Sequence, residues 1–172
     1  MRIKYNINDF VIREELKKIP PGEHYLYLIR KQGITTWDVQ HNLARHFRIA
    51  PKTLSFCGLK DRNAVAFQHM SSPRLLSRSY DAKKFTLTLL GTVAHRLGAS
   101  DLLKNHFEVI IRDIDNGDIE RFNKNVEEVI LNGFANYFDE QRFESRLGAD
   151  DFVARRLMLR QYEGALKLLI AQ

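Results

Sequence analysis

Cysteine is nearly absent from this chain, because Cys57 is the single one among 172 residues. One cysteine excludes an internal disulfide and a cysteine-rich zinc site. Long apolar runs are missing too, since no window approaches the roughly 18 apolar residues of a membrane-spanning helix. Residues 1–6 lack the apolar core of a signal peptide. These absences lead us to expect a cytoplasmic protein that does not associate with a membrane.

The patterns typical of metal and nucleotide sites are absent as well. The sequence contains neither HExxH nor paired cysteines, and neither GxxxxGKS/T nor GxGxxG. His41 and His46 are poorly spaced to share one face of a helix. We therefore expect no metal site and no nucleotide-binding loop.

What remains is the composition of an ordinary globular domain, with 44% hydrophobic and 28% charged residues. A chain of this length can bury a substantial core, and we expect one domain over residues 1–172. The 27 lysines and arginines exceed the 21 acidic residues, which gives a net charge of +6. That excess favours a polyanionic partner such as nucleic acid, although many basic proteins bind none.

Apolar periodicity predicts more strands than helices. Residues 95–104 read as a loop or short helical turn, residues 71–82 as irregular, and Gly164 as a break in the terminal helical region. Few strands alternate with helices, so the expected class is α+β, with a mostly antiparallel sheet flanked by helices. The expected strands are 9–16, 24–31, 53–58, 64–70, 85–93 and 107–111, and the expected helices are about 35–47, 119–133 and 151–171.

The most informative stretch is 56–68. It breaks an apolar strand at Gly58, places Asp61 between Lys60 and Arg62, and then resumes as a second strand. Opposite charges close by favour the ionised carboxylate, which can act as a nucleophile or a base. The alternative is a surface turn, where aspartate, asparagine and glycine are common.

Three further segments combine polar groups with aromatic rings. The amide of Asn105 matches the hydrogen-bonding edge of uracil, and Phe107 could stack on a base. Asp9 and Phe10 open an earlier strand in the same way, and residues 136–143 contain three aromatics. The alternative for each phenylalanine is a place in the core. Residues 136–143 are either core packing or a surface that faces RNA.

Taken together, these segments resemble the TruD family of tRNA pseudouridine synthases over about residues 4–143. Four motifs follow the family's order and approximate spacing, which makes the combination specific although each motif alone is weak. The matching segments are 8–12, Gly58-Leu59-Lys60-Asp61-Arg62 with Ala64-Val65 and Gln68, Asn105-His106-Phe107, and residues 133–143, which read Gly-x-x-Asn-Tyr-Phe followed by Gln-Arg-Phe.

The resemblance implies a pseudouridine-synthase-like catalytic fold and an isomerase that converts uridine, at position 13 of tRNA in bacterial members, without a metal or organic cofactor. It implies that Asp61 is catalytic, that Phe10 and Asn105 contact the target uridine, and that Phe107 lies near it. Lys4 matches a basic position that lines the site. The positions that would support the site are Lys60, Arg62, Gln68, Asn136 and Arg142.

The chemistry agrees with this set of residues. Forming pseudouridine breaks the bond from N1 to C1′ and joins C5 to C1′, so no redox change is needed. One carboxylate suffices, either by attacking C1′ or by removing a ribose proton, and both routes stay open. The base must leave its stack, so rings that hold it and an amide that reads it are expected. Lys60 and Arg62 would keep Asp61 charged and could contact phosphates.

The resemblance also implies that the sheet is incomplete at its C-terminal end. Members of the family are roughly twice this length, and their chain returns after an inserted domain to finish the sheet. We therefore expect a C-terminal half as a partner, and exposed apolar surface at the sheet edge with a tendency to self-associate. The alternative function is a catalytically incomplete RNA-binding fragment that needs this half.

Overall fold

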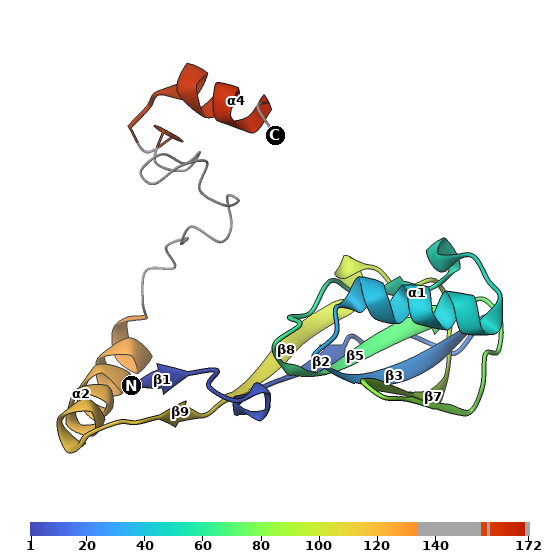
Figure 1. Cartoon of the computed structure of the whole chain (residues 1–172), viewed down its shortest axis with the longest axis horizontal. Coiled ribbons are helices and arrows are strands. Elements are labelled where there is room, and N and C mark those ends of the chain that lie inside the picture. Colours follow the sequence, from blue (N-terminus) through green and yellow to red (C-terminus); the bar gives the residue numbers. More distant parts are fainter. Residues whose placement is uncertain (134–155, 158, 171–172) are drawn as a thin grey trace. The chain divides into compact units, whose positions relative to one another are not determined.

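The computed structural model describes residues 1–133, 156–157 and 159–170 (Figure 1). Contacts divide the chain into two compact units, Met1–Ile119 and Glu120–Gln172. The division falls inside helix α2 (Asn116–Asn132), which buries none of its residues. The sequence led us to expect a single domain over residues 1–172, and that stays a prediction.

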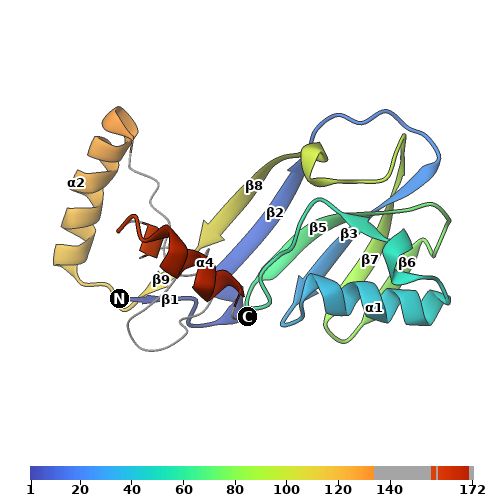
Figure 2. The same ribbon diagram turned by 90° about the horizontal axis from the view of Figure 1, so that it is seen from above.

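The first unit is built on a seven-stranded sheet in the order β6-β7-β3-β5-β2-β8, with β4 also paired to β5 (Figure 2). Every neighbouring pair is antiparallel except β2 and β5, which are parallel. The expected α+β class with a mostly antiparallel sheet is confirmed. The strands are β2 (Phe10–Leu16), β3 (His24–Gln32), β4 (Ser55–Phe56), β5 (Val65–Ser72), β6 (Ser79–Ala82), β7 (Phe85–Val93) and β8 (Leu102–Val109).

Short elements complete the described part of the chain. Strands β1 (Arg2–Ile3) and β9 (Ile111–Arg112) form a separate antiparallel pair. Three 3-10 turns cover Ile7–Asp9, Pro51–Thr53 and Ala99–Asp101, and the helices are α1 (Thr36–Phe47), α2 and α4 (Tyr162–Ile170). Among the described residues, no helix has the length and apolarity needed to cross a membrane.

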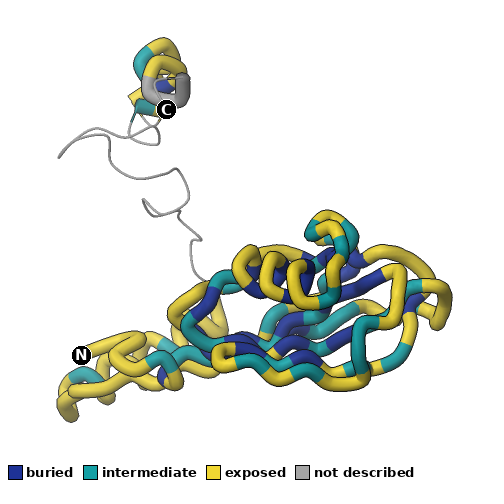
Figure 3. The backbone as a smooth tube through the Cα atoms, turned by 45° about the vertical axis from the view of Figure 1, so that its right-hand side comes forward, coloured by how far each residue is buried: buried dark blue, intermediate teal, exposed yellow. Residues whose placement is uncertain are grey.

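Helix α1 covers one face of the sheet and closes the main core (Figure 3). Its N-terminus is capped by Thr35, whose hydroxyl accepts the N–H of Asp38. Val39 and Leu43 from the helix meet strand residues that lie opposite one another in the ladder and therefore share a face. These strand residues are Tyr27, Ile29, Met70 and Leu87.

The same face continues onto β2 and β8. Ile12 lies opposite Ala66 on β5 and Phe107 on β8. Because side chains alternate along a strand, Phe10 and Asn105 also lie on this face. The register therefore places Phe10 and Ile12 on one side of β2 and Val11 on the other.

Several local expectations were wrong. The strand expected over 53–58 is reduced to the two-residue β4, because Pro51 starts a 3-10 turn that ends at Thr53. The segment 71–82, expected to be irregular, is so only over 73–78: its start extends β5 to Ser72 and its end forms β6, where backbone pairing with β7 compensates for a weak apolar pattern. Likewise β8 begins at Leu102, within the expected loop. Gly164 lies inside α4 because strong helix formers surround it.

Candidate active site

The Asp61 loop (residues 57–64) connects β4 to β5, and buried side chains hold its backbone in place. The fully buried Lys31 on β3 donates from Nζ to the carbonyls of Lys60 at 3.0 Å and Asp61 at 2.7 Å. It also donates to the carbonyl of Ile34 at 2.9 Å. The carbonyl of the residue that carries the candidate catalytic carboxylate is therefore fixed by an ammonium group inside the protein.

Two more side chains join this anchor. Gln68 on β5 donates from Nε2 to the carbonyl of Gly58 at 2.6 Å. The Thr36 hydroxyl accepts the N–H of Lys60 at 3.1 Å and donates to Gln68 Oε1 at 3.0 Å. Gln68, expected to support the site, therefore acts through the loop backbone, and the first turn of α1 is tied to the same loop.

The Lys60 side chain points into the protein. Its ammonium forms a 2.6 Å ion pair with Glu14 on β2, and the two side chains are 7% and 0% exposed. The expectation that Lys60 flanks the carboxylate and contacts phosphates is therefore wrong. The successive side chains of Lys60, Asp61 and Arg62 point in different directions. The buried Glu14 carboxylate binds that of Lys60.

Glu14 is a structural group rather than a surface charge. The parallel ladder between β2 and β5 pairs residues as far as Arg13 and Phe67. Beyond that point Glu14 Oε2 accepts the N–H of His69 at 2.8 Å. Burial raises the pKa of Glu14, but hydrogen bonds from His69 and Lys60 outweigh it, and the pKa lies below its usual value.

The Asp61 carboxylate has a different partner from the one expected. Its Oδ2 accepts a hydrogen bond from Lys4 Nζ at 2.9 Å, and both side chains are partly exposed. Lys4 Nζ also lies 4.0 Å from the centre of the Phe10 ring. Lys4 has a φ of 56°, which is uncommon for a residue with a side chain and typical of functional segments. Lys4 thus joins the carboxylate to the aromatic part of the site.

Phe10 stacks on Phe107, with ring centres 6.0 Å apart and planes 20° apart. Asn105 lies two positions before Phe107 on β8, opposite Glu14. Its Oδ1 is buried and accepts no hydrogen bond from the residues that the structure describes. Two rings and one buried amide oxygen therefore lie on one face, and Lys4 links the Phe10 end of this face to Asp61.

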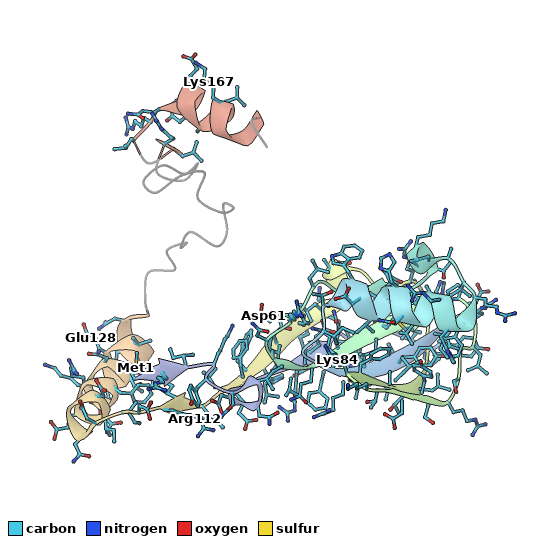
Figure 4. All side chains as sticks on the ribbon, viewed as in Figure 1. Met1, Asp61, Lys84, Arg112, Glu128 and Lys167 are labelled. Atoms are coloured by element: carbon cyan, nitrogen blue, oxygen red, sulfur yellow. The ribbon has the colours of Figure 1, made fainter. Side chains whose placement is uncertain are left out.

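A cavity of about 290 Å³ opens beside the carboxylate, at the first turn of α1. Asp61, Arg62, Leu59 and Trp37 are among its lining residues, and Figure 4 shows the labelled Asp61 side chain near the start of α1. Arg62, expected to support the site, is exposed here. Within the described part of the chain, no group of three or more His, Cys, Asp or Glu is placed to hold a metal. Asn136 and Arg142 lie outside the described residues.

Sequence reasoning missed Lys31, Glu14 and Thr36 as parts of this site. A signal was present for Lys31, since it continues the face of β3 that carries Tyr25, Tyr27 and Ile29. Its burial lowers its pKa to about 8 from an ordinary 10.5. Nothing local marks Glu14, because its role depends on a strand that is distant in the sequence.

Comparison with known proteins identifies the family of this chain. The family model described as tRNA pseudouridine synthase D (TruD) matches residues 1–172. A probable tRNA pseudouridine synthase D 1 from Methanococcus maripaludis is 30% identical over 99% of this chain and 44% of its own length. A tRNA pseudouridine synthase D from Aquifex aeolicus is 31% identical over 97% of this chain and 46% of its own.

A crystal structure of a putative TruD from Methanosarcina mazei has the same fold. It aligns with a TM-score of 0.78 and 24% identity over 98% of this chain and 41% of its own. The chain thus spans less than half the length of the relatives that it matches. Since the family model covers it from end to end, the chain belongs to the TruD family of tRNA pseudouridine synthases.

Proposed function

We propose that this chain is the N-terminal part of the catalytic domain of a tRNA pseudouridine synthase, with Asp61 as the catalytic group. One observation carries the proposal. The Asp61 carboxylate sits on a loop whose backbone is bound by buried side chains, and it bonds to Lys4 beside two stacked rings. A fixed carboxylate next to an aromatic pair suits a reaction on an extruded base.

The reaction needs one bond to break and another to form. The N1–C1′ bond breaks, uracil turns, C5 bonds to C1′, and the proton on C5 is lost while N1 gains one. Asp61 can attack C1′ and be displaced from it when C5 attacks. Alternatively, it can take the proton from C2′, leave a sugar unsaturated between C1′ and C2′, and return that proton to C2′ as C5 bonds to C1′. The partial exposure of its carboxylate gives either path access to the sugar.

The target base would be held by the other residues on this face. The Phe107 ring is exposed and stacked on Phe10, so its free side can receive a pyrimidine. Asn105 lies on the same face of β8 as Phe107, and its amide carries the donor and the acceptor that match the edge of uracil. Lys4 would hold the carboxylate in position. We infer that the target is uridine 13 of tRNA, as in bacterial members of the family, and that the protein is cytoplasmic.

The rest of the catalytic domain would come from a C-terminal portion. The apolar side chains exposed on β8, an edge strand, give the sheet a place to continue. We propose that both units described above belong to one domain in that complete protein. In isolation, the same edge would favour self-association.

Replacing Asp61 tests the function. In the complete protein, Asp61→Asn should abolish conversion of uridine in tRNA, as measured by the loss of hydrogen from C5, and should leave tRNA binding intact. The exposed Asp81 on β6 gives a matched control, and Asp81→Asn should react like the parent. Unchanged turnover by Asp61→Asn would refute the proposal. Salt-sensitive tRNA binding without conversion by the 172-residue chain would show that this portion alone is a binding fragment.

A further inference from the structure

We propose that Trp37 and Leu59 form a second base-binding site, a platform on which a nucleotide next to the target uridine stacks. This inference rests on the proposed function, in which the Asp61 site acts on RNA. It adds a binding position in a cavity that Asp61 lines and that Lys4, Phe10 and Phe107 do not line.

Trp37 is exposed at a place where packing does not require it. It is the second residue of α1, and its side chain is 56% exposed, while the buried positions of the helix include Val39 and Leu43. An exposed apolar residue on its own needs no explanation. Here, however, Leu59 in the Asp61 loop is 61% exposed and lines the same hollows as Trp37. Two large apolar side chains from separate elements thus form one exposed surface.

That surface adjoins the candidate catalytic group. Trp37 and Leu59 line the cavity of about 290 Å³ that also contains Asp61. They line a second cavity of about 220 Å³ as well. A molecule resting on the indole could therefore extend into both hollows, and the first leads directly to the carboxylate.

The charges around the platform suit a nucleic acid strand. Arg62 lines the first cavity and Arg96 the second, so each of the two cavities that Trp37 lines also has a cation in its lining. Asp38 is the nearest acid on α1, and its carboxylate already accepts the Thr35 hydroxyl at 2.6 Å. An aromatic ring flanked by arginines is the arrangement that binds single-stranded nucleic acid, with bases on the ring and phosphates on the cations.

Base extrusion gives a reason for such a platform. When the target uridine leaves the stack, the neighbouring base loses one of its stacking partners. A tryptophan close to the carboxylate can replace that partner, and it accepts any base because every base has a flat face. The platform would thus stabilise the open RNA without reading its sequence.

Trp37→Ala in the complete enzyme tests this step. We expect tRNA to bind about tenfold more weakly, with kcat at saturation unchanged, because stacking is lost while the catalytic group stays in place. Trp37→Phe should restore most of the affinity, which a purely structural role of the indole would not predict. Leu90→Ala on β7 removes an equally exposed apolar side chain elsewhere and should bind like the parent.

A fluorescent base identifies the occupant. Two RNAs are compared, each with 2-aminopurine at one of the two neighbours of the target uridine. The parent enzyme should quench the RNA whose 2-aminopurine stacks on Trp37, and the same RNA should stay bright with Trp37→Ala. Equal affinity and equal quenching for parent and variant would overturn the platform and would leave the apolar pair for a protein contact. That result would not touch the role of Asp61, which is judged by conversion in Asp61→Asn. Loss of tRNA binding by the parent itself would refute the underlying function instead.

Discussion

The part of the sheet under α1 and the part formed by β2 and β8 share one face but differ in burial. Where α1 covers the sheet, Tyr27 of β3 and Leu43 of α1 are fully buried in the main core. On β8, Phe107 is 61% and Val109 42% exposed. The covered part holds the fold together, and the open part presents the groups that would meet RNA.

The Asp61 loop lies at the boundary between the two parts and is tied to both. Lys31, on the covered side, binds the carbonyls of the loop, and Glu14, on the open side, binds the Lys60 ammonium. The position of the carboxylate therefore depends on buried polar groups on both sides of the loop rather than on the loop's own sequence. Three predictions test this, in order of decreasing effect.

Glu14→Gln should show that the open part also contributes stability. It leaves the Lys60 ammonium buried without its counter-charge, so we expect the free energy of unfolding to fall by about 3–5 kcal/mol. Urea denaturation of the 172-residue chain measures this. Glu108→Gln removes the carboxylate of an exposed pair with Arg13 and should cost at most about 1 kcal/mol. Equal transition midpoints for the two variants would contradict the structural role of Glu14.

Leu43→Ala and Phe107→Ala should separate stability from binding. Leu43→Ala leaves a cavity in the core and should lower the free energy of unfolding by about 2–5 kcal/mol, with kcat per folded enzyme unchanged. Phe107→Ala should change stability of the 172-residue chain by less than about 1 kcal/mol. In the complete enzyme it should weaken tRNA binding about tenfold, because a stacking surface is lost. A large stability loss from Phe107→Ala would remove the distinction between the two parts.

Raising the pH should lower activity by deprotonating Lys31. Burial lowers its pKa to about 8, the Asp61 charge opposes this, and the Lys60 charge adds to it. Above that pH, two N–H donors remain for three carbonyls, so the loop loses one anchor and activity should fall by at most about tenfold between about pH 7 and 9. The folded pKa is below the unfolded value, so this group's contribution to stability instead increases between pH 8 and 10.5.

Opposite trends in activity and stability therefore identify Lys31 as the titrating group. The Lys31→Met enzyme lacks that group, and its activity should be lower and should not fall in this pH range. A parallel loss in parent and variant would assign the pH effect to another residue.

Much of this was predictable from the sequence. The alternation in 24–31 and the Thr35 cap are local patterns, and the structure has both. The family motifs picked out Asp61, Phe10 and Phe107, and the described contacts connect these residues through Lys4. Strand β6 was not predictable, because its residues become extended only by pairing with β7.

The direction of the Lys60 side chain was also not predictable. Sequence spacing suggested two cations around one carboxylate, whereas burial drew Lys60 to Glu14 and left Lys4 as the described partner of Asp61. A charged group inside a protein needs hydrogen bonds or an opposite charge, and Lys60 found its opposite charge on a strand 46 residues away in the sequence.

The sequence by itself determined most of the strands and helices, the family to which the chain belongs, and Asp61 as the candidate acid. These depend on neighbouring residues and on short motifs. Only the tertiary structure decided that Lys31, Thr36, Gln68 and Glu14 hold the Asp61 loop, and that Trp37 shares a cavity with Asp61. Such contacts join residues from separate strands and a helix, so they exist only once the sheet has brought those elements together.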